Sequence, residues 1–81
     1  MIDMKIYWNG ASKNIIGDKI KDLRKSKGLT QKALAEKLQL LGHDYSELTI
    51  LRIEKGVRFV PDYEVVQLAD FFNVSTEELL R

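Results

Sequence analysis

Glycine, proline and asparagine residues divide this chain into short segments whose apolar residues recur at helical spacing. Ile16, Ile20 and Leu23 follow one another at steps of four and three residues, which places them on one face of a helix. Gly28 would end this helix in a left-handed turn. A strand-like run occurs only at residues 4–8, followed by an Asn9-Gly10 turn. The pattern therefore predicts several short helices and no extensive sheet.

Four further helices are predicted from capping residues at the ends of apolar stretches. They are expected over residues 31 to about 41, about 46 to 55, 62 to 73, and 75 to 80. Thr30 and Asp62 would cap the first and third of these helices, and Asn73 would end the third. Residues predicted to pack from the third helix are Val65, Val66, Leu68, Ala69 and Phe72. Ser75 and Glu78 have the spacing of a capping box at the start of the last helix.

The length of 81 residues favours one small domain and leaves no room for a second, catalytic one. We expect an all-α, compact bundle of about five helices over residues 14–81, preceded by a short N-terminal arm over residues 1–13. The chain has no cysteine, which excludes disulfides and thiolate zinc sites and fits a reducing cytoplasm. No apolar stretch approaches the roughly 18 residues of a membrane span. A cytoplasmic location without membrane contact is therefore expected.

Residues suited to catalysis are scarce. The one histidine, His43, lies beside Asp44 in a predicted connector with no further motif around it. Neither a GxxxxGK[ST] nor a GxGxxG phosphate-binding motif occurs, and the carboxylates lack metal-ligand spacing. The sequence therefore predicts no enzyme activity, no metal and no cofactor.

The two halves of the chain differ in charge. Residues 1–40 hold nine basic and four acidic residues, whereas residues 41–81 hold four basic and eight acidic residues. One face of the folded domain could therefore bind a polyanion, or the charges could form an ordinary solvated surface. Charge alone does not decide between these two interpretations.

A set of motif residues runs in a fixed order from the first predicted helix to the last. They are Leu23-Arg24, Gly28-Leu29-Thr30-Gln31, Leu34-Ala35, Leu38, Ser46, Thr49-Ile50, Arg52-Ile53-Glu54, Gly56, Arg58, Pro61, Asn73-Val74-Ser75 and Leu79. Together they resemble the helix-turn-helix DNA-binding domain of the Cro and lambda-repressor type, also called the XRE family. The resemblance covers about residues 16–80 and implies a lambda-repressor-like fold that binds double-stranded DNA.

The resemblance also implies roles for particular residues. The helix over residues 46–55 would enter the major groove, about 12 Å wide, with its N-terminal residues nearest the bases. The implied base-facing residues are Ser46, Glu47, Leu48 and Arg52. The implied phosphate-facing residues are Thr30, Gln31, Lys55, Val57 and Arg58. In the family, the residues matching Arg24 and Glu54 pair internally and hold the first helix to the end of the reading helix.

Two features depart from the family pattern. The eight positions from Leu38 to Ser46 exceed the usual spacing, so we expect a longer second helix, to about Leu41, with Gly42 at positive φ. Glu47 is an acid near expected phosphates, and it could accept a hydrogen bond from a cytosine amine. Alternatively, Asp44 is the N-cap and Glu47 its capping-box partner, which is the interpretation we favour.

These features predict a sequence-specific transcriptional regulator that binds a near-palindromic operator as a homodimer, because one helix reads only a few base pairs. Candidates for the subunit contact are Phe71, Phe72, Leu79, Leu80 and the arm residues Tyr7 and Trp8. The length argues against a small-molecule effector domain. The alternative is an antitoxin or adaptor with a protein partner, which the near-neutral charge, Glu47 and an exposed Leu48 would favour.

Overall fold

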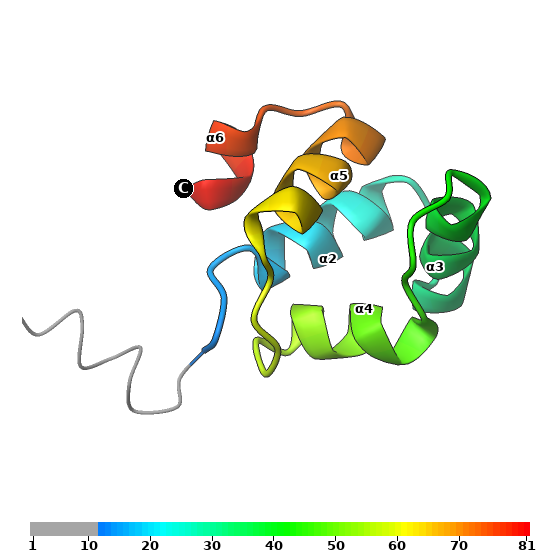
Figure 1. Cartoon of the computed structure of the whole chain (residues 1–81), viewed down its shortest axis with the longest axis horizontal. Helices are drawn as coiled ribbons and strands as arrows, with labels where there is room; N and C mark the ends of the chain where they lie inside the picture. The colour runs from blue at the N-terminus through cyan, green and yellow to red at the C-terminus, as the bar shows by residue number, and fades with distance from the viewer. Residues whose placement is uncertain (1–11) are drawn as a thin grey trace, which may run out of the picture.

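The computed structural model of the chain describes residues 12–81, and every regular element there is a helix (Figure 1). The helices are α2 (Gly17–Ser26), α3 (Gln31–Leu40), α4 (Glu47–Glu54), α5 (Asp62–Phe72) and α6 (Thr76–Leu80). The expected all-α bundle of five helices is confirmed. The predicted strand-like run and the Asn9-Gly10 turn lie outside the described residues.

The core is formed by the apolar residues that recur at helical spacing. α3 and α2 both pack against α4, and α5 packs against α6. The fully enclosed side chains are Ile20, Leu34, Leu38, Ile50, Ile53 and Leu68. Val65 is buried as predicted, but the prediction for Val66 is wrong because this side chain is exposed. Val66 lies about 100° around α5 from Val65, on the side of the helix that faces solvent.

Most predicted helix ends are confirmed by the backbone. Asn73 ends α5 in the left-handed conformation with φ 56°, and Ser75 and Glu78 form the capping box of α6. Asp62 is not the N-cap of α5: Pro61 holds that position in an extended conformation, and Asp62 is the first helical residue. As Asp62 lies in the first turn, its carboxylate still complements the positive end of the helix dipole.

The connection between α3 and α4 is built as its glycine predicts. α3 ends at Leu40, and Gly42 follows with φ 87°, a conformation that costs glycine nothing and other residues about 1 kcal/mol. The chain then turns back, and Tyr45 enters the core with 1% of its surface exposed. The connection is thus a short loop with its own anchor, and α4 starts directly after that anchor.

α2 begins against the end of α4. The Asn14 side chain accepts hydrogen bonds from the Ile16 and Gly17 amides at 3.1 and 2.8 Å, satisfying two amides at the start of α2. Its amide nitrogen donates to the Ile53 and Arg58 carbonyls at 3.1 and 2.8 Å. A Cβ atom at Gly17 would overlap the Ile53 carbonyl oxygen. Glycine at this position therefore allows the close approach of α2 to α4.

Two residues assigned to the arm belong with the domain in this structure. The Lys13 amide donates to the Gly56 carbonyl at 2.6 Å, and the Ser12 side chain packs over Gly56. The described part of the arm therefore lies against the loop that follows α4.

Several predicted subunit-contact residues are part of the core instead. Phe72 and Leu79 are 5% and 1% exposed, so their side chains cannot reach a second copy of the chain. Phe71 is partly buried and packs edge-on to Phe72, with ring centroids 5.0 Å apart. Leu80 remains exposed, and Tyr7 and Trp8 lie outside the described residues. Phe72 and Leu79 are therefore core residues, because the packing of α5 on α6 encloses both side chains.

Candidate functional site

α4 has one buried face and one exposed face. Ile50 and Ile53, three residues apart, are completely enclosed and hold the helix on α2 and α3. The residues predicted to face bases are all exposed: Ser46 and Glu47 lie at the N-terminal end of α4, and Leu48 and Arg52 lie on the side opposite Ile50. We call these four residues the α4 outer face. In Figure 1, α4 lies at one edge of the domain, away from α5 and α6.

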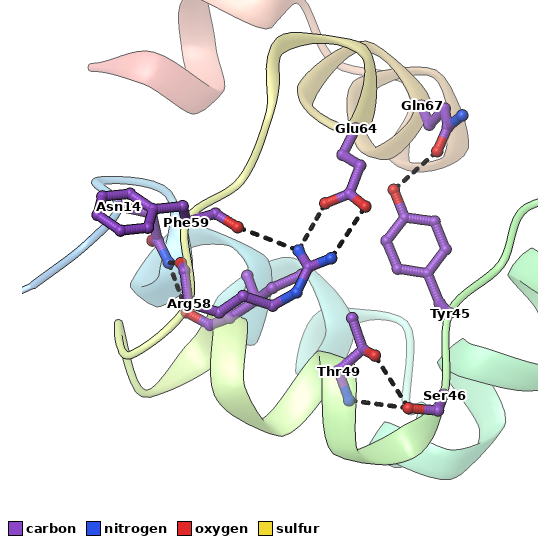
Figure 2. Close-up of polar contacts among 9 residues, drawn as sticks. Asn14, Tyr45, Ser46, Thr49, Arg58, Phe59, Glu64 and Gln67 are labelled. Carbon is purple, nitrogen blue, oxygen red and sulfur yellow. Dashed lines mark hydrogen bonds and ion pairs between the residues drawn. The ribbon is translucent and has the colours of Figure 1, made fainter.

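The first turn of α4 is capped by Ser46. Its hydroxyl accepts a hydrogen bond from the Thr49 amide at 3.1 Å and lies 2.9 Å from the Thr49 hydroxyl (Figure 2). The favoured interpretation, in which Asp44 caps and Glu47 is its capping-box partner, is therefore wrong. Glu47 is the first residue of the helix and its side chain is exposed. Its carboxylate is thus free of a capping role.

The predicted pair of Arg24 and Glu54 is present and buried. Arg24 Nε donates to Glu54 Oε2 at 2.6 Å, and Arg24 Nη2 donates to Glu54 Oε1 at 2.9 Å. A third donor, Nη1, reaches the Leu29 carbonyl at 2.8 Å. The hydrogen bond to Glu54 raises the pKa of Arg24, which keeps it charged. The pair locks α2 and the turn before α3 to the last turn of α4.

The start of α3 holds two residues that were predicted to face phosphates. Thr30 is exposed and caps the helix through a 3.0 Å hydrogen bond from the Ala33 amide to its hydroxyl. Gln31 instead donates from Nε2 to Glu54 Oε1 at 3.0 Å, so its side chain completes the buried pair. The first backbone amides of α3 have no acceptor within the helix and suit an anion. Contact of Thr30 and Gln31 with phosphate stays a prediction.

The loop after α4 differs from expectation at Arg58. Lys55 and Val57 are exposed, as a phosphate-facing role requires. The Arg58 guanidinium points to α5, where Nη1 and Nη2 donate to the two carboxylate oxygens of Glu64 at 2.6 and 3.1 Å (Figure 2). Glu64 is buried, so releasing Arg58 would leave an unpaired buried carboxylate. In this structure Arg58 is therefore paired within the protein, and its contact with phosphate stays a prediction.

Tyr45 contacts the same part of α5. Its hydroxyl donates to Gln67 Oε1 at 2.8 Å, and its backbone carbonyl accepts from Gln39 Nε2 at 2.6 Å. Burial, and next the negative charge of Glu64, raise the pKa of Tyr45 above its ordinary value. The hydroxyl therefore stays protonated and remains a donor. Tyr45, Arg58, Glu64 and Gln67 line a polar pocket of about 370 Å³, together with residues of the α3–α4 loop.

Asn14, Tyr45, Glu64 and Gln67 were not predicted as part of the site. Tyr45 could have been found as the one large aromatic residue in the predicted connector, because loops seldom carry a tyrosine that is not anchored. Glu64 and Gln67 lie three residues apart on one helix, a spacing common to many pairs of surface residues. No local signal marks them as partners of residues on another element.

Two further observations concern the described residues 12–81. They contain no group of three or more histidine or carboxylate side chains placed to hold a metal ion. None of the helices found there is long and apolar enough to cross a membrane.

Comparison with known proteins connects this geometry to a family. The family model described as a helix-turn-helix domain matches residues 17–81. The crystal structure of the DNA-binding domain of BldD is 30% identical, with a TM-score of 0.71, over 85% of this chain and 93% of that chain. The S. venezulae BldD DNA-binding domain is 31% identical, with a TM-score of 0.70, over 84% and 94% respectively. No curated protein matches the chain.

Proposed function

The chain belongs to the helix-turn-helix domain family, and from this membership we propose that it is a sequence-specific, DNA-binding transcriptional regulator. α4 is the reading helix, and its outer face enters the major groove. The observation that carries the proposal is that Ile50 and Ile53 of α4 are fully buried, whereas Ser46, Glu47, Leu48 and Arg52 are exposed. The similarity to the DNA-binding domain of BldD supports the same assignment.

Arg52 is the residue best suited to read a base. It lies one turn after Leu48 on the outer face, it is exposed, and it has no ion pair within residues 12–81. Its planar guanidinium can donate two hydrogen bonds to guanine O6 and N7, a contact worth about 1 to 3 kcal/mol of discrimination. Lys55 and the backbone at Val57 would contact phosphates beside it. The start of α3 would contact a further phosphate.

The proposal includes a homodimer on a near-palindromic operator, because one reading helix covers only a few base pairs. It requires no enzymatic activity, no cofactor and no small-molecule effector, and it places the chain in the cytoplasm with the DNA. Among the described candidates for the subunit contact, Leu80 is exposed and Phe71 is partly buried.

One observation favours a second candidate function. Leu48 is 49% exposed at the centre of the outer face, and an exposed leucine suits a protein partner as well as a thymine methyl group. Together with Glu47 it would fit an antitoxin or adaptor module that keeps this fold but binds a protein. The two functions differ in whether the outer face recognises base pairs.

The test is selection of bound duplexes from a random DNA pool, followed by titration of the selected site and its single-base variants at several salt concentrations. Arg52→Ala should abolish the preference at one base pair of each half-site. Lys55→Ala should weaken binding to all sequences equally and make the slope of log affinity against log salt shallower by about 0.9 for each phosphate that is no longer neutralised. Arg81→Ala, at the chain end distant from α4 in Figure 1, is the control and should change neither.

Two results would reverse the assignment. A wild-type chain that selects no preferred sequence removes the proposed function and favours the protein partner. Intact base preferences in Arg52→Ala would show that α4 is not the reading helix.

A further inference from the structure

Both ends of α4 are tied to α5 through side chains (Figure 2). At the N-terminal end, Tyr45 directly precedes the cap Ser46 and donates its hydroxyl hydrogen to Gln67. At the C-terminal end, Arg58 in the following loop binds Glu64 through two hydrogen bonds. Glu64 and Gln67 lie three residues apart, so they stand on one face of α5. α5 therefore contacts, at two separate points, the chain segments that flank α4.

We propose that Tyr45 and Gln67 are positioning residues for the α4 outer face. Their hydrogen bond fixes the angle at which the first turn of α4 meets DNA, and so sets the base preference of Ser46, Glu47 and Leu48. This inference rests on the proposed function. The inference goes beyond the proposed function by assigning part of the base specificity to residues that do not touch DNA.

The need for such an anchor follows from the loop before α4. At the start of this loop Gly42 has φ 87°, and the Gly42 and His43 amides bond the Gln39 and Leu38 carbonyls at 2.9 and 3.0 Å. Leu41 and Asp44 of the same loop are exposed. The buried ring of Tyr45 holds the loop to the core, but apolar packing has no preferred direction. The bond from Gln39 Nε2 to the Tyr45 carbonyl holds the backbone, and the directional hydroxyl-to-Gln67 bond adds a second constraint that fixes the rotation of the ring. Base readout requires a fixed orientation of the first turn of α4, because contacts to the bases must be held to within about 0.5 Å.

The two ends of α4 are held by different hydrogen bonds. Near the C-terminal end, Asn14 Nδ2 bonds the Ile53 and Arg58 carbonyls, and Arg58 binds Glu64. None of these contacts involves Tyr45 or Gln67. Loss of the Tyr45–Gln67 bond should therefore release the first turn of α4 and leave the turn that carries Arg52 in place. The inference thus predicts a change confined to part of the binding site.

The experiment uses the best site selected by the wild-type chain, made as a fluorescently labelled duplex, and all its single-base variants. Tyr45→Phe removes only the hydroxyl, and Gln67→Met removes the acceptor with little change in volume. The matched control is Tyr63→Phe, which removes the hydroxyl of an exposed tyrosine on α5 that makes no hydrogen bond within residues 12–81. The readout is the ratio of affinities between base variants, because a lower folded fraction reduces all affinities equally and cancels.

We expect each variant to lower discrimination about three- to tenfold at the base pairs read by the first turn of α4, the range of one neutral hydrogen bond. Discrimination at the base pair read by Arg52 should stay unchanged. The double variant Tyr45→Phe/Gln67→Met should match the single variants, because all three lack the same bond. The control should stay within about twofold of wild type at every position, as expected for a surface change.

Three outcomes overturn the inference. Wild-type base preferences in both single variants would show that the bond does not position α4, while DNA reading itself would stand. An equal loss at all positions would give the bond a structural role only. A wild-type chain without a preferred site would remove the proposed function and this inference together.

Discussion

The ion pairs Arg24–Glu54 and Arg58–Glu64 hold the end of α4 and the loop behind it, but water reaches them to different extents. In the first pair the side chains are 9% and 3% exposed, and Leu29 and Gln31 add further hydrogen bonds. In the second pair the glutamate is also buried, with 8% of its side chain exposed, but the arginine is 31% exposed. The first is a closed network among three helices, and the second has one open side.

This difference indicates how each pair contributes to the fold. Removing one partner from a buried pair leaves the other charge without compensation, and the penalty grows as water is excluded. In the Arg58–Glu64 pair, water can solvate the arginine but not the glutamate. The two pairs should therefore respond differently to the same substitution, and the following changes test that difference in order of decreasing effect.

The largest effect is expected for Glu54→Gln. The change leaves the Arg24 charge buried and unpaired, which typically costs about 3 to 5 kcal/mol. The total stability expected for a domain of this length is about 4 to 12 kcal/mol. Urea denaturation followed by circular dichroism should show a large loss or an unfolded chain.

The double variant Arg24→Met/Glu54→Leu separates charge from packing. It removes both charges and keeps apolar bulk, so it should be more stable than Glu54→Gln. If Glu54→Gln unfolds at the urea concentration of the wild type, the closed network does not carry the stability assigned to it.

A smaller loss of about 1 to 3 kcal/mol is expected for Glu64→Gln, because the freed Arg58 can turn to water. Glu77→Gln is the matched control: its partner Arg81 forms an exposed pair four residues away, and exposed pairs contribute little. A loss in Glu64→Gln as large as that in Glu54→Gln would remove the distinction between the two pairs. A loss no larger than that of Glu77→Gln would also contradict the prediction, because Glu64 would then behave like a partner in an exposed pair.

The two pairs also differ in how far the sequence predicted them. Arg24 and Glu54 occupy family motif positions, so their pairing could be inferred although thirty residues separate them. The family resemblance implied that Arg58 faces phosphate, and no residue near it in the sequence indicates an internal partner. Glu64 lies six residues later, in the first turn of α5, where a carboxylate is favoured by the helix dipole with or without a pair.

The helices themselves were predictable because their signals are local. Gly42, Asn73 and the Ser75 capping box each determine backbone geometry within a few residues. The errors concern choices that depend on tertiary contacts. Asp44 and Ser46 are both good N-caps, and the choice of Ser46 follows from the burial of Tyr45 between them. The same burial determines which residues of α4 form the outer face.

The smallest expected effect is a loss of stability at alkaline pH through Tyr45, which lies beside the Arg58–Glu64 pair. Its pKa is raised mainly by burial and next by Glu64, while Arg58 lowers it. The folded pKa therefore lies above the unfolded value of about 10, so this contribution to stability is complete below pH 10 and is lost as pH rises above it.

Relative to Tyr45→Phe, the wild type should lose about 1 kcal/mol of unfolding free energy between about pH 10 and pH 11, close to the linkage limit for one proton. Urea titrations of both proteins across this range give the difference directly, and the titration of other groups cancels in the comparison. The Arg24–Glu54 network should not contribute to this difference. Parallel pH curves would show that Tyr45 ionises as readily in the folded chain as in the unfolded one, which its enclosure beside the Glu64 carboxylate does not allow.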